Sequence, residues 1–528
     1  MMPDGAERLW SAARNSARKP AAIRLAPVLA CIAFGFALSV YLANGAPLYY
    51  FDTASYLGQG HSMLDAIGFH DRAPAAVPAA GPSPDATDAS GGPTDETVDT
   101  SRSAAYALGL AILDAIAPID LTVLANLALV WTATVLVTRQ LGPPGETTRL
   151  AAIGLIAGTL GALPFYVAFL MPDIFTPVLL LMLALLCTYG PGLDRWELGL
   201  ATALALAAVL AHPSHLLTAA LVMPVGFLIS PAFRRRRLIL PLALICIIVG
   251  GGVAERLGFA AAVEQVEGRD AQALPFLTAR LIDDGPGYAY LLRKCPDPEI
   301  ATCALLAPLS RSDNPLRLGA PHILFSTQPD TGSLKLLSTA EQRAIAAEQM
   351  AFVQDVIRSA PLAVVAAAVR NTLTQLAYVG VDMTVPPPPR LADLKDAYGD
   401  DAASLRDGRL VAADRAWLAV LRPIHEAVYV ASALLLAGLL LFPSRLPPGG
   451  RTFIVVTFVG LLIHAAVCGG VSVPADRYGA RAALTLPILA AIFGTIALWR
   501  RQEGSPSPAV VLGAASPDRS ASTGRQSA

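Results

Sequence analysis

A single carboxylate, Asp52, stands among aromatic and hydroxyl side chains in the segment LYYFDTASYLGQG, residues 48–60. An aspartate within reach of a hydroxyl group can accept its proton as a general base. Arginine binds phosphate through charge-assisted, often bidentate hydrogen bonds. Three arginines stand near the ends of apolar runs, namely Arg102, Arg477 and Arg481. If these four side chains meet, they can activate a hydroxyl nucleophile and stabilise a departing phosphate.

Other polar residues stand at the ends of further apolar runs, and we expect them to bind substrate at the same site. These candidates are Tyr56, Tyr106, Asp173, His212, His215, Asp476 and Tyr478. Structural interpretations compete with this one. Asp52 alone could be an interface carboxylate, Asp173 could cap a helix, and Arg477 and Arg481 could be snorkelling residues. Pro213 makes the HPSH segment a turn with two polar caps rather than a metal site.

The elements that must position these residues are membrane helices. Of 528 residues, 54% are hydrophobic and 15% are charged, and the mean hydropathy is +0.53; a soluble protein has about 25% charged residues. Apolar runs recur at close to the length that crosses about 30 Å of hydrocarbon. We predict an all-α polytopic membrane protein with about ten transmembrane helices, embedded in a lipid bilayer. The expected spans are 25–43, 119–138, 150–168, 174–189, 198–211, 216–230, 238–254, 427–442, 453–470 and 483–499.

Basic residues indicate which loops face the cytoplasm. Five of them precede the first run, and RRRR occupies residues 234–237; such clusters favour the cytoplasmic side. We therefore expect both termini to be cytoplasmic in a multi-pass protein of a bacterial-type plasma membrane. All candidate site residues then share the external boundary. The net charge of −1 argues against a nucleic-acid partner.

The same pattern gives a domain organisation. It comprises a cytoplasmic tail at 1–24, a transmembrane domain at 25–254 with an external loop at 44–103, an external segment at 255–424, transmembrane helices at 425–499, and a disordered tail at 500–528. Residues 74–100 are low in complexity and are expected to be flexible. Residues 361–380 carry Arg370 within an apolar run, and a charge at that depth is costly. This segment is therefore expected at the interface, and whether it crosses stays open.

Two cysteines, Cys295 and Cys303, stand apart from the rest because they lie in a polar segment, RKCPDPEIATCALL. If this segment faces an oxidising compartment, the pair is expected to form a disulfide. Two free thiols are the alternative.

The combination of an aspartate after the first span, an R-S-x-x-Y element at residues 102–106 and a late DRYGAR element at 476–481 resembles the GT-C superfamily. These are membrane glycosyltransferases that use polyprenyl-phosphate sugars, among them protein O-mannosyltransferases and aminoarabinose transferases. The resemblance implies that Asp52 is the catalytic base, and that the arginines contact the phosphate of a polyprenyl-phosphate-linked sugar. The family's Asp-Glu pair is absent because Thr53 follows Asp52, so a divalent metal requirement is left open.

Two other functions compete with sugar transfer to an external lipid, glycan or protein. A transporter would need ionisable groups along a path through the membrane, such as His464. A non-catalytic assembly or scaffold protein would use the external segment to bind a partner.

Overall fold

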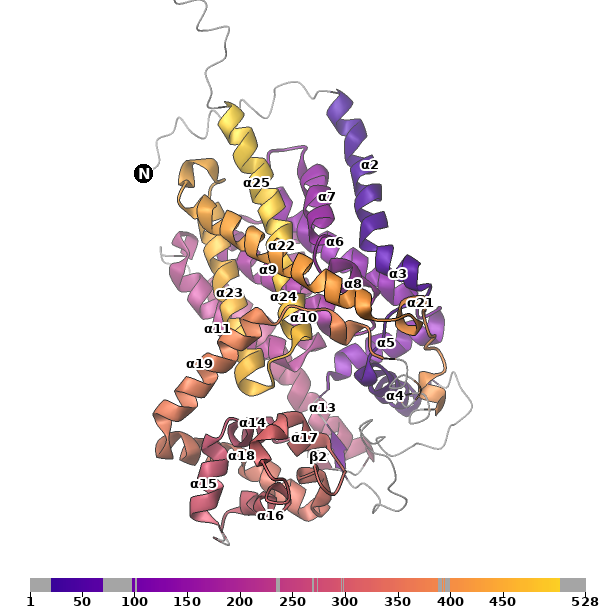
Figure 1. Ribbon diagram of the computed structural model, residues 1–528. Helices are drawn as coiled ribbons and strands as arrows, with labels where there is room; N and C mark the ends of the chain where they lie inside the picture. The colour runs from indigo at the N-terminus through magenta and orange to yellow at the C-terminus, as the bar shows by residue number, and fades with distance from the viewer. Residues whose placement is uncertain are drawn as a thin grey trace, which may run out of the picture.

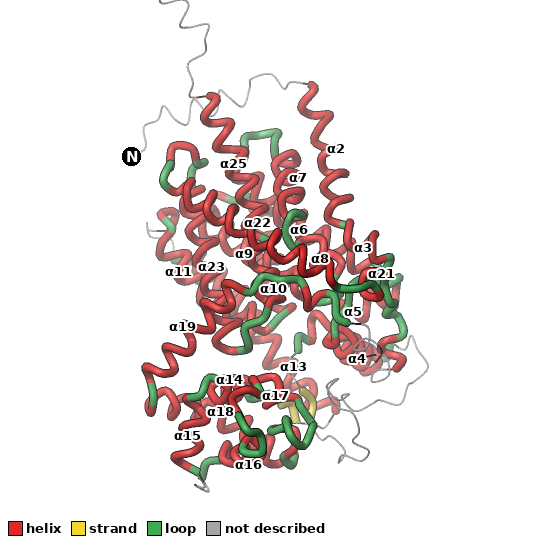
Figure 2. The backbone as a smooth tube through the Cα atoms, viewed as in Figure 1, coloured by secondary structure: helices red, strands yellow, loops and turns green. Residues whose placement is uncertain are grey.

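The computed structural model describes residues 20–69, 97–99, 102–233, 238–267, 270–272, 274–295, 297, 299–387, 392, 394 and 399–503. Within this part, the chain is almost wholly helical, and only two short strands interrupt it (Figure 2). The tails at 1–19 and 504–528, the RRRR segment and most of the predicted flexible stretch at 74–100 lie outside the described residues.

The N-terminal half contributes helices that lie mainly in the upper bundle of Figure 1. They are α2 (Pro20–Ala37), α3 (Ser39–Asn44), α4 (Phe51–Ala66), α5 (Ala104–Ile116), α6 (Leu121–Leu141), α7 (Thr147–Gly158), α8 (Leu163–Ala168), α9 (Phe175–Tyr189), α10 (Arg195–Ala211), α11 (Pro213–Ile229), α12 (Ile239–Ile245) and α13 (Gly251–Glu267). Short turns lie between them at η1 (Pro172–Ile174), η2 (Gly190–Gly192), η3 (Pro231–Phe233) and the π-helical η4 (Cys246–Gly250).

The C-terminal half first builds a separate helical lobe and then returns to the bundle (Figure 1). Its helices are α14 (Phe276–Asp283), α15 (Pro286–Lys294), α16 (Leu306–Leu309), α17 (Gly319–Phe325), α18 (Thr339–Ser359), α19 (Pro361–Ala377), α21 (Arg409–Ala412), α22 (Ala416–Leu440), α23 (Gly450–Val471), α24 (Asp476–Ala483) and α25 (Thr485–Glu503). Its 3₁₀ turns are η5 (Ala301–Leu305), η6 (Pro315–Arg317), η7 (Leu334–Leu336), η8 (Asp382–Thr384), η9 (Gly399–Ala402) and η10 (Pro443–Arg445).

Six helices of the described chain are long and apolar enough to cross a membrane, which makes this a multi-pass membrane protein. They are Leu121–Leu141, Pro172–Gly192, Ile239–Gln265, Ala416–Leu440, Gly450–Val471 and Asp476–Gln502. A seventh is added if the bent pair α18 and α19 counts as one span. The other four predicted spans fall on shorter helices, α2, α7, α10 and α11, so the count of ten is not confirmed.

The helix break between α7 and α8 has a clear physical cause. The span expected over 150–168 is interrupted after Gly158, and α8 starts only at Leu163. The Tyr429 hydroxyl accepts a hydrogen bond of 2.8 Å from the Ala162 amide, and its ring fills the space where Gly161 has no side chain. A tertiary contact from α22 therefore stabilises a turn that lies just before Pro164, in the first turn of α8.

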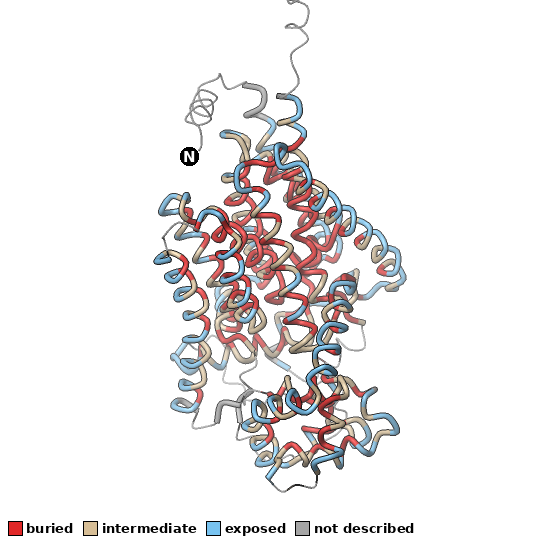
Figure 3. The backbone as a smooth tube through the Cα atoms, turned by 90° about the vertical axis from the view of Figure 1, so that its left-hand side faces the viewer, coloured by how far each residue is buried: buried red, intermediate tan, exposed pale blue. Residues whose placement is uncertain are grey.

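The bundle and the lobe have separate hydrophobic cores. Buried residues concentrate in the bundle (Figure 3), where α9 is buried along most of its length. The lobe, α14 to α18, closes around Ile282, Leu291, Leu309 and Leu334, none of which is exposed. Each such side chain contributes about 1.5–3 kcal/mol when it leaves water.

Strand β1 (Thr97–Asp99) pairs in parallel with β2 (Asp270–Gln272) and so attaches the end of the first loop to the chain that follows α13. Residues 97–99 had been expected to be flexible. At the other end of this loop, the Leu48 amide donates to the Ala168 carbonyl at 2.7 Å, and the Leu170 amide donates back to Leu48 at 2.8 Å. This bridge fixes the start of α4 beside the turn that carries Asp173.

Candidate functional site

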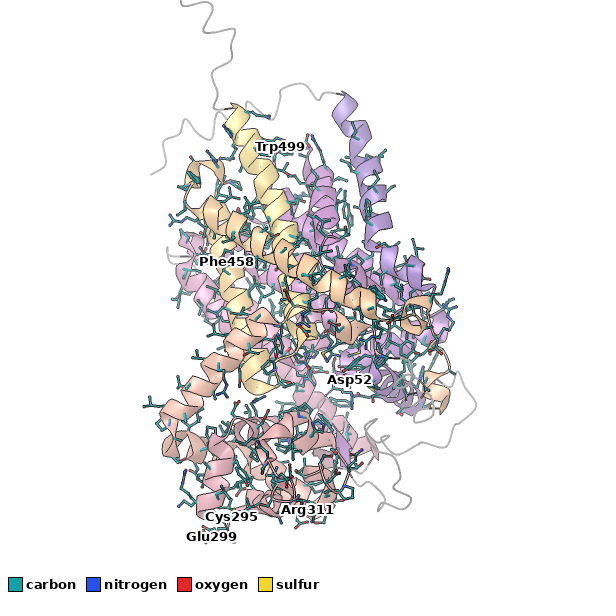
Figure 4. All side chains as sticks on the ribbon, viewed as in Figure 1. Asp52, Cys295, Glu299, Arg311, Phe458 and Trp499 are labelled. Carbon is teal, nitrogen blue, oxygen red and sulfur yellow. A yellow bond between two sulfur atoms is a disulfide. The ribbon has the colours of Figure 1, made fainter. Side chains whose placement is uncertain are left out.

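Asp52 lies in the first turn of α4, at the end of the bundle that faces the lobe (Figure 4). The helix starts there because Tyr50 is extended and its amide donates to the Thr53 hydroxyl at 2.9 Å. The Thr53 hydroxyl in turn donates to the Leu170 carbonyl at 3.2 Å. A carboxylate is favourable in the first turn, where the helix dipole is positive.

Two arginines from distant parts of the chain flank this carboxylate. Arg102 Nη2 lies 3.3 Å from Asp52 Oδ1, and Arg477 Nη1 lies 3.9 Å from Asp52 Oδ2. The Asp52 side chain is 36% exposed, whereas that of Arg477 is 5% exposed. The proximity expected between Asp52 and the late DRYGAR turn is therefore present, and the roles of these residues stay predictions.

A second carboxylate, Asp173, lies deeper in the protein and contacts both Arg477 and Arg481. Its Oδ1 is 3.1 Å from Arg481 Nη1 and 3.5 Å from Arg477 Nε. Asp173 and Arg481 are fully buried. Asp173 belongs to the 3₁₀ turn η1 rather than to an N-cap, and its carboxylate serves as the counter-ion of two arginines.

We call Asp52, Arg102, Asp173, Arg477 and Arg481 the arginine cluster. Its three guanidinium groups face two carboxylates, a formal excess of one positive charge. Four of its buried atoms lack a hydrogen-bond partner in the structure, namely Asp173 Oδ2, Arg477 Nε, Arg477 Nη1 and Arg481 Nε. Buried N–H groups without an acceptor are costly and rare. The cluster therefore has both the charge and the donors to take up an anion.

Aromatic rings cover the guanidinium groups. The Arg477 guanidinium carbon lies 4.9 Å from the Tyr50 ring centroid and 5.2 Å from that of Tyr478. The Arg481 carbon lies 4.7 Å from the Tyr478 ring. Cation–π contacts of this kind are worth about 0.5–2 kcal/mol and restrict the orientation of the arginines. Tyr50 was not among the predicted site residues, although its position two residues before Asp52 was a usable signal.

The two histidines predicted to bind substrate differ in their contacts. His215 is fully buried, with Nε2 2.7 Å from the Thr176 hydroxyl and Nδ1 2.7 Å from the Ala208 carbonyl. Because Nδ1 must donate to the carbonyl, Nε2 accepts from Thr176, and both ring nitrogens are used within the protein. In His212, Nδ1 accepts from the Ser214 amide at 3.2 Å and lies 2.8 Å from its hydroxyl.

Ser214 connects His212 to the cluster and Cys468 connects His464 to it, and neither Ser214 nor Cys468 was predicted from the sequence. Arg481 Nη2 donates to the Ser214 hydroxyl at 3.4 Å and to Cys468 Sγ at 3.7 Å. His464 Nε2 lies 3.3 Å from the Tyr478 carbonyl. His464 therefore belongs to the packing around Arg481.

The predicted tyrosines of α4 and α5 pack against each other beside Asp52. The ring centroids of Tyr56 and Tyr106 are 5.1 Å apart, and the Tyr106 hydroxyl is buried without a hydrogen-bond partner. Burial raises the pKa of the Tyr56 phenol, so this group stays protonated. The two helices approach closely because Gly60 has no side chain; a Cβ there would lie 2.2 Å from the Ala107 carbonyl oxygen.

Asp476, also predicted to bind substrate, has different neighbours. Its Oδ1 accepts from the Gly380 amide at 2.9 Å and from Arg422 Nη2 at 2.8 Å. These contacts join α24 to α22 and to the segment after α19. The structure records no contact between the Asp476 carboxylate and the arginine cluster.

The predicted disulfide is confirmed. Cys295 and Cys303 are bonded at the far end of the lobe, well separated from Asp52 (Figure 4). Its position shows that it stabilises the lobe and takes no part in the site.

The arginine cluster does not suit a divalent metal. Among the described residues, no group of three His, Cys, Asp or Glu side chains could hold a metal ion. In addition, both Asp52 oxygens face guanidinium groups, whose charge opposes a second cation. An anion suits this site better than a metal does.

Comparisons of the chain with protein-family models, with curated proteins and with solved structures find no match.

Proposed function

We propose that this protein is a GT-C-like membrane glycosyltransferase, which moves a sugar from a polyprenyl phosphate to an external lipid, glycan or protein. The observation that supports this proposal best is the contact of Asp52 with Arg102 and Arg477 at the edge of a positively charged cluster. A carboxylate that is 36% exposed, beside buried N–H donors that make no hydrogen bond, suits a reaction in which a hydroxyl loses a proton and a phosphate departs.

In the proposed reaction, the two arginines bind the donor phosphate and Asp52 acts as the general base. Arg477 and Arg102 hold the donor phosphate through charge-assisted hydrogen bonds. Asp52 takes the proton of the acceptor hydroxyl as that oxygen bonds to the anomeric carbon. The bond between this carbon and the phosphate oxygen breaks, and the lipid phosphate leaves with the electron pair. The 3.9 Å contact of Asp52 Oδ2 with Arg477 exceeds hydrogen-bond length, so this oxygen retains capacity to accept the proton.

Buried Asp173 keeps the arginines in place during this reaction. It contacts both Arg477 and Arg481 while remaining inaccessible. Ser214 holds the other edge of Arg481. We assign Asp173 and Ser214 as positioning residues, and Tyr50 and Tyr478 as the aromatic walls of the phosphate site.

The same proposal includes the topology. Ten crossings require α2, α7 with α8, α10 and α11 to span as short helices, with both termini cytoplasmic in a bacterial-type plasma membrane. The cluster and the lobe then share the external side, where polyprenyl-phosphate sugars are used by GT-C enzymes.

The test is sugar transfer from a radiolabelled polyprenyl-phosphate sugar by the full chain in nanodiscs. Asp52→Asn is expected to lower turnover by at least about 100-fold, the usual contribution of a general base, while binding of polyprenyl phosphate persists. Arg477→Gln should weaken that binding. Asp65→Asn, an exposed carboxylate on the same helix, serves as the matched control. Equal turnover by wild type and Asp52→Asn would remove Asp52 from catalysis, and donor binding without transfer by wild type would favour a non-catalytic protein.

A further inference from the structure

Helix α19 carries an apolar stripe that the protein leaves uncovered. Its members recur every three or four residues and are 44–84% exposed; they are Leu362, Val365, Val369, Leu373 and Leu376. This spacing places them on one face of the helix. The opposite face is buried through Ala367, Asn371 and Gln375.

The buried face of α19 packs on α23, one of the membrane-spanning candidates. The contact is close because Gly469 lacks a side chain; a Cβ there would lie 2.6 Å from the Asn371 carbonyl oxygen. On α23 itself, Leu462 is 52% exposed. The stripe therefore lies on the outer side of a helix whose other face packs on a membrane-spanning candidate.

The bend before α19 sets its direction. Helices α18 and α19 meet at 107°. The α18 side is capped and polar, with Ser338 and Glu341 at its start and Arg358 72% exposed in its last turn. The chain thus changes within a few residues from the polar helix α18 to the helix α19, which carries the exposed apolar stripe. Figure 1 shows α19 between the lobe and the bundle.

A shallow groove lies beside the stripe. It has a volume of about 440 Å³ and runs between α15 and α19, where small side chains such as Ala363, Ala366 and Ala367 form its wall. Arg370 stands at this groove with its side chain 62% exposed, and its Nη2 also lies 3.4 Å from Oδ1 of Asp284, a carboxylate that lines the same groove. An apolar wall with an exposed guanidinium nearby matches the chemistry of an acyl chain and its phosphate headgroup.

We propose that α19 lies in the membrane–water boundary and is a lipid-binding surface. Acyl chains of bilayer phospholipids cover the stripe and enter the Ala-lined groove, and headgroup phosphates lie near Arg358 and Arg370. The occupant is lipid rather than a second protein because α19 packs on α23, a membrane-spanning candidate, and its stripe faces away from that contact. This surface is separate from the arginine cluster and does not depend on the glycosyltransferase proposal.

The test places a nitroxide label at Leu373 in the full chain, with exposed Cys31 and Cys246 replaced by serine, in phospholipid nanodiscs. The matched control is a label at Met350, which is 55% exposed on the water-facing helix α18 of the lobe. Collision rates with oxygen, which concentrates in lipid, and with a water-soluble nickel chelate report the surroundings of each label. The ratio of oxygen to nickel collisions is expected to be several-fold higher at Leu373 than at Met350.

Two results would overturn the proposal. Equal ratios at both positions would put α19 in water. An immobile label at Leu373 that neither reagent reaches would mean that another protein surface covers the stripe. A second label at Val365 repeats the measurement if the Leu373 variant does not fold.

Discussion

Removing the charge of Asp173 tests whether the arginine cluster is held together by a buried ion pair. Asp173→Asn keeps the size of the side chain but removes the one carboxylate that contacts Arg481 within the described residues, and the Arg481 side chain is fully buried. At 3.1 Å, the pair has a Coulomb energy of about 5 kcal/mol in an effective dielectric of about 20. Desolvation offsets part of this energy, and breaking a buried pair from one side costs about 3–5 kcal/mol.

The assay is equilibrium unfolding of detergent-solubilised protein, followed for Asp173→Asn, for Arg481→Gln and for the double variant. Because Asp173→Asn leaves Arg481 without its carboxylate and Arg481→Gln leaves Asp173 with Arg477 alone, the double variant should be less destabilised than the sum. The expected coupling free energy is about 2–3 kcal/mol.

An exposed pair supplies the matched control. Arg406 and Asp120 approach to 2.6 Å, closer than the buried pair, yet their side chains are 56% and 22% exposed. Solvent screens such a pair, so its coupling is expected to stay below about 1 kcal/mol. If the buried pair couples no more strongly than this one, burial does not strengthen the cluster, and the counter-ion role of Asp173 is wrong.

Three further perturbations have defined outcomes. Gly479→Ala would put a Cβ 1.8 Å from a backbone carbonyl oxygen and should lower the thermal midpoint strongly, whereas Gly470→Ala meets nothing within 4 Å and should not. Ser338→Ala should destabilise the start of α18 by about 1 kcal/mol, seen as faster amide exchange. The hydrogen bonds from Ser338 lower the pKa of the Glu341 carboxyl group from its usual 4.5. Their contribution to the stability of α18 is therefore present above about pH 4.5 and is lost as the pH falls through the lowered pKa of Glu341. Cys295→Ser opens a disulfide of sequence separation 8 and should cost the lobe about 2–3 kcal/mol, measured by protease resistance.

The lengths of the apolar runs and the positions of the polar segments predict many of the structural features of this protein. The long helices and the Cys295–Cys303 bond follow from such local composition. The helix that carries the span expected at 238–254 continues to Gln265, and in this extension Glu255 and Arg256 pair at 3.3 Å.

The site was partly predictable for a similar reason. Charges at the ends of apolar runs must collect at a boundary, and this places Asp52 and Arg477 on one side. Which partners meet depends on how helices rotate against each other. Asp476 thus pairs with Arg422, while Ser214, hidden inside a histidine motif, contacts Arg481.

The pairing of β1 with β2 has a practical consequence for engineering. It anchors the chain at Thr97–Asp99, three residues before Arg102. Changes of length upstream, at 70–96, are therefore expected to be tolerated, since longer loops cost little additional entropy. An affinity tag or a fluorescent protein inserted there should leave the Arg102–Asp52 contact unchanged, which offers a handle for purification and single-molecule work.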